Sequence, residues 1–239
     1  MNRLFVLLIL LFPSFADAEP NTIIHILNYH YVSPGEFAAD LKDQDNTVTQ
    51  EQIDKAYSYF LKVVEANQRD QMKLLRRLIK EHNLKAVYVE GLTEQNHKGT
   101  LRFIETLKKY ERTKTDPPES GIDRLVAAQN RLDRLELGAV GLLVVSGELE
   151  TILPAEDSAA FDAANPVKAD GSIEFDKEAE ERREDAIVRN LLKADGVAVI
   201  TLGEAHVLSD NLRRLGSDCK YKLVVANPQV IKRAPSVKE

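Results

Sequence analysis

Two histidines and a glutamate stand at the ends of three apolar, strand-like runs that lie far apart in the chain. His30 follows the run at residues 23–27, Glu90 ends the run at 86–89, and His206 follows the run at 197–202. In open α/β sheets, polar groups delivered by separate strands converge outside the carboxyl ends of those strands. The sequence therefore predicts one site that contains His30, Glu90 and His206.

Imidazole nitrogens and carboxylate oxygens are ligands that suit Zn, Mn or Fe. We predict that His30, Glu90 and His206 bind a divalent metal of this kind, whose bound water is the nucleophile of a hydrolytic reaction. Glu90 either binds the ion or acts as base, and Glu204 assists as a second carboxylate. The glycine before Glu204, Gly203, allows the backbone to turn sharply or a ligand to approach closely.

Arg183 lies on the helix that the sequence predicts over residues 174–194, just before the third strand-like run. A guanidinium that reaches the site from this helix would hold an anionic group or a developing negative charge. The alternative is that Arg183 belongs to a solvated charged face, on which Glu178 and Arg182 form a pair four residues apart.

Each of these side chains also has a purely structural interpretation. A histidine at a strand end is often only hydrogen-bonded structure, Glu90 can be an acidic strand exit, and Glu204 can cap the helix that follows it. The remaining candidates are predicted to lie away from the site. His25 has the opposite strand parity to His30 and faces the other side of the sheet, whereas three side chains are expected to be solvated: His82, His97 and Glu156.

Strand-like runs alternate with amphipathic helices along the chain, which predicts an α/β fold with a mostly parallel sheet covered by helices. Thr49 opens a long helical pattern that reaches Asn83, either as one helix or as two with a short bend near Asn67. Shorter helices are expected at 98–110, 122–137 and 208–215. In the middle of the chain, the apolar run at 140–145 predicts a buried strand that forms a β-hairpin with 150–154. Loops are expected at 33–35 and 155–173, and a last strand at 221–226.

The first eighteen residues have the three parts of an export signal: a positive start at Asn2-Arg3, an apolar core at 4–12, and a small-x-small site at Ala16-Asp17-Ala18. We expect cleavage after Ala18 and export to the periplasm or the medium. The apolar core is too short for a permanent membrane span, which needs roughly 20 residues. Residues 19–239 are then a single α/β domain, in which 113–175 is an inserted or variable region.

The composition excludes some classes of partner. The net charge is -6, with 38 acidic against 32 basic residues, so the chain lacks the basic surface that nucleic acid binding requires. Aromatic residues make up 6% and Trp is absent, which argues against a stacking platform for bases. A small molecule or a peptide is the expected substrate. Cys219 is the only cysteine, so an intramolecular disulfide cannot form, and packing at a strand entry is its expected role.

The order of these motifs resembles the superfamily of erythromycin-esterase-like, ChaN-like and Tiki/TraB proteins. The superfamily has an early histidine motif and a central strand ending in Glu, which match Leu27-Asn28-Tyr29-His30 and Val89-Glu90-Gly91. It also has a helix with an Arg motif and a late Gly-x-x-His, which match Arg183-Glu184-Asp185-Ala186-Ile187 and Gly203-Glu204-Ala205-His206. The family's early motif usually has glycine three residues before the histidine, where this chain has Leu27.

The resemblance implies an α/β fold with a site at the strand ends, and its members differ in what that site does. Relatives include metal-dependent peptidases, esterase-like hydrolases and haem-binding proteins, so the fold alone does not select a function. We predict a metal-dependent hydrolase of the peptidase or esterase-like kind. The alternatives are a non-catalytic carrier in which the same histidines hold haem or an iron chelate, and an interaction module that has lost the activity.

Overall fold

The computed structural model describes residues 22–114, 117–118, 120–167 and 172–227. The expected export signal at residues 1–18 lies outside these ranges. Strands and helices alternate through most of the described chain, in the order β1 (Thr22–Asn28), α1 (Pro34–Gln44), α2 (Gln50–His82), β2 (Ala86–Thr93), α3 (Glu94–Thr113), α4 (Gly121–Val145), β3 (Thr151–Glu156), α5 (Ser158–Ala163), α6 (Lys177–Leu191), β4 (Val197–Gly203), α7 (Ser209–Arg214) and β5 (Lys220–Val224).

The five strands form one parallel sheet in the order β3-β2-β4-β1-β5. This confirms the α/β fold with a largely parallel sheet. The three strands that carry the predicted site, β2, β4 and β1, are neighbours, and Asn28 at the end of β1 pairs in register with Gly203 at the end of β4. Their carboxyl ends therefore meet at one edge of the sheet, as the convergence of strand ends requires.

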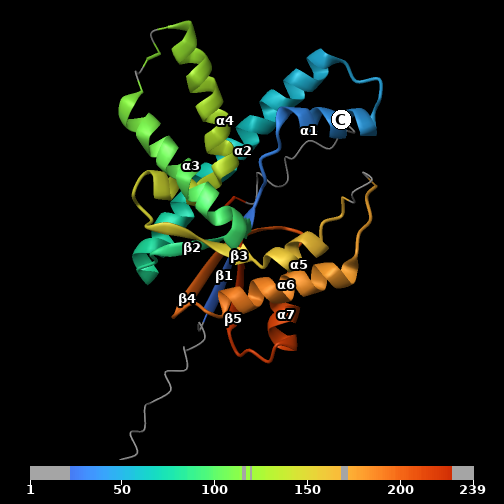
Figure 1. The fold of residues 1–239 in the computed structure, drawn as a ribbon, viewed down its shortest axis with the longest axis vertical. Helices are drawn as coiled ribbons and strands as arrows, with labels where there is room; N and C mark the ends of the chain where they lie inside the picture. Colours follow the sequence, from blue (N-terminus) through green and yellow to red (C-terminus); the bar gives the residue numbers. More distant parts are fainter. Residues whose placement is uncertain (1–21, 115–116, 119, 168–171, 228–239) are drawn as a thin grey trace, which may run out of the picture.

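Helices cover both faces of the sheet (Figure 1). Alternate strand residues such as Ile24, Ile26 and Val199 face a core formed with α2, α3 and the second half of α4. The opposite set, such as Ala198 and Ile200, packs against α6 and α7. Strands buried on both faces read as nearly continuous apolar runs, which is why they stand out in the sequence.

The long helix α2 runs without interruption from Gln50 to His82, and Thr49 and Gln52 form the capping box expected from the sequence. At its other end Asn83 adopts a left-handed conformation (φ 51°) that ends the helix. The loop expected at 33–35 is wrong in part, because Pro34 and Gly35 form the first turn of α1 and the extended Ser33 caps that helix. No helix in the described ranges is both long and apolar enough to cross a membrane.

The strand predicted at 140–145 is wrong, and so is the hairpin that depends on it. These residues form the last turns of α4, after a break at Gly138 (φ 73°, ψ 177°), and residues Ala139 to Val144 are all buried. A short run that is buried on every side has no apolar period, so the sequence cannot distinguish helix from strand there. The following strand, β3, pairs in parallel with β2 at the edge of the sheet.

Candidate functional site

The three side chains predicted to converge do lie together at the carboxyl ends of β1, β2 and β4. His30 follows β1 by two residues, Glu90 lies within β2, and His206 follows β4 by three residues. His30 Nε2 lies 3.0 Å from Glu90 Oε2, and His206 Nε2 lies 3.5 Å from Glu90 Oε1. The carboxylate of Glu90 thus lies between two imidazoles, with one oxygen toward each.

The backbone of β4 anchors the same carboxylate. Gly203 donates its N–H to Glu90 Oε2 at 2.7 Å, and the Arg183 guanidinium lies 3.7 Å from Oε1. A Cβ atom at position 203 would come within 3.0 Å of His30 Nε2 and 3.6 Å of the Glu90 oxygens. Glycine at this position therefore provides room for the close approach of the histidine and the carboxylate.

His206 is held between carboxylates and only 7% of its side chain is exposed. Its Nδ1 contacts Glu184 Oε1 at 3.0 Å, with Glu180 Oε1 at 3.5 Å, while Nε2 faces Glu90. Burial lowers the pKa of His206, but the hydrogen bonds to Glu184 and Glu90 outweigh it and raise the pKa to about 9. His206 is therefore an imidazolium at neutral pH.

The proton that His206 carries in turn favours the charged form of Glu90. Burial alone would raise the pKa of this carboxyl group, yet the hydrogen bonds from His206 and His30 hold it well below its usual range. Glu90 is a carboxylate across the whole physiological pH range, which leaves it able to accept hydrogen bonds but not to donate one.

His30 differs from His206 in that 53% of its side chain is exposed. Gln71 on α2 donates to the Leu27 carbonyl at 2.9 Å and to Asn28 Oδ1 at 3.2 Å, so the amide nitrogen of Asn28 faces His30 Nδ1 at 3.3 Å. A neutral His30 then carries its proton on Nε2, toward Glu90, and a lone pair on Nδ1. The hydrogen bond to Glu90 raises the pKa of His30 despite partial burial.

Arg183 on α6 reaches the site, as one of the two sequence interpretations predicted. Its Nε and Nη2 bind Glu156 at 3.1 and 2.7 Å, its Nη1 lies 3.2 Å from Glu180, and it stacks 5.0 Å from the ring of Phe161. The expectation that Glu156 is solvated is wrong, because its side chain is fully buried and also accepts the Gly91 N–H at 3.2 Å. Glu156 ends β3, so the rule of strand ends applies to it as well.

Two further acidic residues, Glu180 and Glu184, were not predicted as site residues. They lie one helical turn apart on α6, and Arg183 lies between them in the sequence. The same side of α6 therefore presents all three side chains to the strand ends. The spacing of four residues between Glu180 and Glu184 places them on one face of a helix, but it does not show whether that face is turned to the sheet. Glu178 and Arg182, on another face of α6, form the predicted exposed pair at 3.9 Å.

Glu204 is exposed and forms no ion pair with the site in the described part of the chain. The pKa of the Tyr29 phenol is raised, mainly by burial and to a smaller extent by the negative charge of Glu204. His25 is buried on the α6 side of the sheet and binds the Tyr221 hydroxyl at 2.6 Å and the Leu202 carbonyl at 2.9 Å. Glu204 and His25 therefore lie outside the contacts that join Glu90 to His30 and His206.

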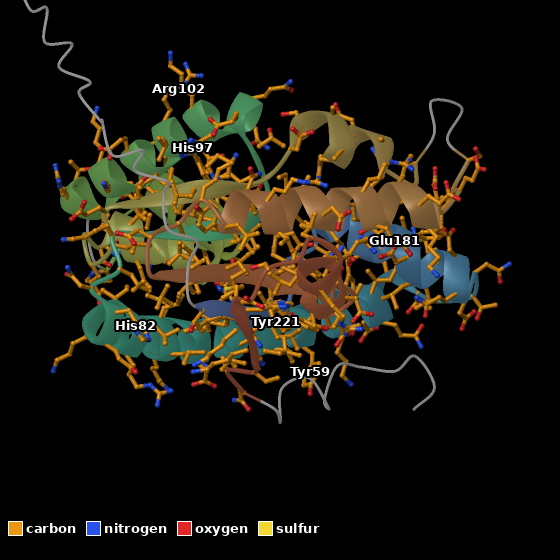
Figure 2. All side chains as sticks on the ribbon, turned by 90° about the horizontal axis from the view of Figure 1, so that it is seen from below. Tyr59, His82, His97, Arg102, Glu181 and Tyr221 are labelled. Carbon is orange, nitrogen blue, oxygen red and sulfur yellow. The ribbon has the colours of Figure 1, made fainter. Side chains whose placement is uncertain are left out.

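The predicted positions of the other two histidines are corrected in part. His97, expected to be solvated, lies on α3, is half-buried and contacts the Ile152 carbonyl at 3.0 Å through Nε2. His82 lies in the last turn of α2, as expected, beside Glu81. Figure 2 shows both on outer helices, with His82 at the opposite side of the molecule from Glu181 on α6.

No family model, curated protein or solved structure matches this chain. The interpretation of the cluster therefore depends on its own geometry.

The donor set of the cluster has the chemistry of a Zn or Fe site, but its atoms are already engaged with one another. Glu90 Oε2 accepts from Gly203 and faces His30, and Oε1 lies between His206 and Arg183. Within the described ranges, no group of three or more His, Cys, Asp or Glu residues is arranged to hold an ion. The observed contacts favour hydrogen bonds between these side chains over their coordination of a metal ion. The metal site stays a prediction.

Proposed function

We propose that this cluster is the acid–base centre of a hydrolase, with His30 as the general base. The observation that carries the proposal is the asymmetry of His30: Nε2 faces the Glu90 carboxylate at 3.0 Å while 53% of the side chain is exposed. A carboxylate that fixes the tautomer of an imidazole and stabilises its protonated form is the arrangement used in acid–base catalysis. The opposite nitrogen, Nδ1, is then the atom that takes a proton.

In the proposed reaction, a water molecule at Nδ1 loses a proton to His30 as its oxygen attacks the carbonyl carbon of an ester or amide. The imidazolium is stabilised by Glu90 and later returns the proton to the leaving oxygen or nitrogen. The Asn28 amide nitrogen, which lies 3.3 Å from Nδ1, must turn away to admit this water and can then donate a hydrogen bond to its oxygen. Arg183, 3.7 Å from Glu90, offsets part of the negative charge of that carboxylate.

The hollow beside His30 limits the size of the group that reacts. A cavity of about 140 Å³ adjoins His30 and Glu90 and is bounded by Asn28, Gln71 and the α4 break at Gly138. Pockets that enclose drug-sized ligands measure roughly 300–1,000 Å³. The cavity is suited to the reacting group of a small ester or peptide, with the rest of the substrate outside it.

A metal-dependent form of the same hydrolase is the second candidate, and one contact favours it. Glu184 orients His206 through Nδ1 and leaves Nε2 toward Glu90, which is how carboxylates commonly support metal-binding histidines. In this form His30, Glu90 and His206 would hold Zn, Mn or Fe, and the ion would supply an activated water. The haem alternative needs a wider space than the cavity beside His30 offers, so we rank it third.

The export of the protein and its place in the erythromycin-esterase-like, ChaN-like and Tiki/TraB superfamily are retained as proposals. What supports the superfamily is the position of its motif residues: His30, Glu90, Arg183 and His206 contact one another or a shared carboxylate. Glu204 is still proposed to assist as a second carboxylate. Its side chain is exposed, and no contact with Glu90 supports that role.

One experiment separates these candidates. The purified protein is analysed for bound metal and then assayed against ester and peptide libraries with and without a chelator. The acid–base proposal expects activity that resists the chelator and falls about 100- to 10,000-fold in a His30→Ala variant, the usual contribution of a general base. His82→Ala is the matched control, because His82 is a histidine on the outer end of α2. Chelator-sensitive activity would favour the metal-dependent form, and no hydrolysis of any substrate would refute both.

A further inference from the structure

A second and larger cavity lies between α2, the end of α3 and the first half of α4. Its volume is about 640 Å³, within the range of small-molecule sites and several times that of the hollow beside His30. Figure 1 shows α3 and α4 as one arm of the molecule, with α2 passing beside its base. None of the residues in the proposed catalytic cluster lines this cavity.

The lining of the cavity is basic, although the whole chain carries a net charge of -6. Four cationic side chains face it, against the two carboxylates of Glu65 and Glu111: Arg69, Lys114, Arg131 and Arg134. Arg131 binds Glu65 at 2.6 Å, while Arg134 and Lys114 share Glu111 at 2.7 and 2.8 Å. The cavity therefore keeps an excess of positive charge.

The arginines also keep donors for a further partner. A guanidinium has five N–H donors. Among the described residues, the side-chain bonds use Nε of Arg131 and Nη1 of Arg134 and leave the other nitrogens of each group. Carboxylates and related planar anions are the groups that such nitrogens bind best, often through two parallel hydrogen bonds.

Apolar side chains form the rest of the wall, in particular Met72, Leu135 and Leu142. A purely inorganic anion would leave this surface unused, whereas a hydrocarbon or ring attached to the anion would cover it. We propose that the cavity binds a small amphipathic organic anion, with its carboxylate on Arg131 and Arg134 and its apolar body against Met72 and Leu142.

This site adjoins the proposed catalytic one without sharing its chemistry. Gln68 and Leu135 line both cavities, and Gln68 donates to the Leu135 carbonyl at 2.7 Å, three residues before the α4 break at Gly138. An occupant would contact the wall that separates the two spaces. The proposal does not depend on hydrolase activity, because it concerns binding to other residues.

The test is isothermal titration of the full chain with decanoate, below its micelle concentration, and with decyltrimethylammonium and acetate as comparison ligands. We expect one decanoate per chain, with weaker binding of acetate and of the cation. The variants Arg131→Met and Arg134→Met should each weaken decanoate binding about tenfold or more, the range of one charge-assisted contact. His30→Ala should leave it unchanged.

Arg76→Met is the matched control. Arg76 binds Glu148 through Nε at 2.6 Å and is 46% exposed, against 2.6 Å and 51% for Arg131, but it does not line the cavity. Both ion pairs are exposed and should contribute little to stability, so folding is checked by urea titration of each variant. Equal affinity for the cation, several weak sites, or unchanged binding in folded Arg131→Met and Arg134→Met proteins would overturn the proposal, as would no binding of decanoate.

Discussion

Replacing Glu90 with glutamine keeps the shape of the side chain and removes the charge that two histidines share. In the native protein Glu90 faces His206 Nε2 at 3.5 Å, and Glu184 holds Nδ1 at 3.0 Å. With an amide at position 90, a neutral His206 can accept a hydrogen bond on Nε2 while it still donates to Glu184. We therefore expect the pKa of His206 to fall from about 9 toward its ordinary value of 6.5.

The size of the effect follows from the pKa of His206. Since the folded pKa of about 9 lies above the unfolded value of 6.5, the stabilisation is fully present below pH 6.5 and is lost as the pH rises to 9. The difference between the folded and unfolded pKa of His206 corresponds to roughly 3 kcal/mol of folding free energy. Glu90 has a lowered pKa, so its contribution is present above pH 4.5 and is lost as the pH falls further. Both values describe the same contacts, so they are not added.

Because Glu184 still raises the pKa of His206 in the variant, we expect Glu90→Gln to lower the free energy of unfolding by roughly 1 to 2 kcal/mol at pH 6, and by clearly less at pH 9.5, where native His206 has also lost its proton. Urea unfolding followed by far-UV circular dichroism at both pH values measures this, and an NMR titration of the histidine ring protons measures the pKa. Glu150→Gln is the control, because Glu150 forms an exposed pair with Lys85 and should change stability by under about 1 kcal/mol. A destabilisation that is the same at both pH values, or a native His206 that titrates near 6.5, would refute the reasoning.

Three further predictions concern the same cluster. Arg183→Met leaves the fully buried Glu156 without its cation and should cost about 3 to 5 kcal/mol in urea unfolding; a double variant with Glu156→Gln that recovers nothing would contradict this. Gly203→Ala places a Cβ 3.0 Å from His30 Nε2, so the ring must move, and we expect the NMR-measured pKa of His30 to fall with native circular dichroism retained. If hydrolysis is found, kcat/KM should rise with pH through the raised pKa of His30, and the acid limb should move to lower pH in Glu90→Gln; a limb that stays in place would exclude His30 as the base.

The sequence predicted the strands that position the site because a parallel sheet buries both of its faces and leaves continuous apolar runs. His30, Glu90 and His206 could be grouped for that reason alone, since the carboxyl ends of β1, β2 and β4 must lie on one edge. The same rule misses Glu156 because the apolar run at 140–145 predicts a strand, which makes residues 150–154 the return strand of a hairpin. A return strand would end on the other edge of the sheet, whereas β3 pairs in parallel with β2.

Other parts of the site depend on how helices dock, which no local pattern encodes. The tautomer of His30 is set by Gln71 through Asn28, and this contact requires the middle of α2 to cross the end of β1. Glu184 lies in the quoted Arg motif, but its role depends on which face of α6 is turned to the sheet. Its contact with His206 shows that the face containing Glu180 and Glu184 is turned inward.

The two histidines of the cluster illustrate why residue type and position along a strand do not determine a chemical role. Both follow strand ends and both contact Glu90, yet His206 is buried between carboxylates and His30 is half-exposed. Around Arg183 and these imidazoles lie four carboxylates, those of Glu90, Glu156, Glu180 and Glu184. Such an excess of negative charge retains a proton at its most enclosed base, which is His206. His30, with solvent on one side and a single carboxylate on the other, is left as the imidazole that can exchange a proton with a substrate.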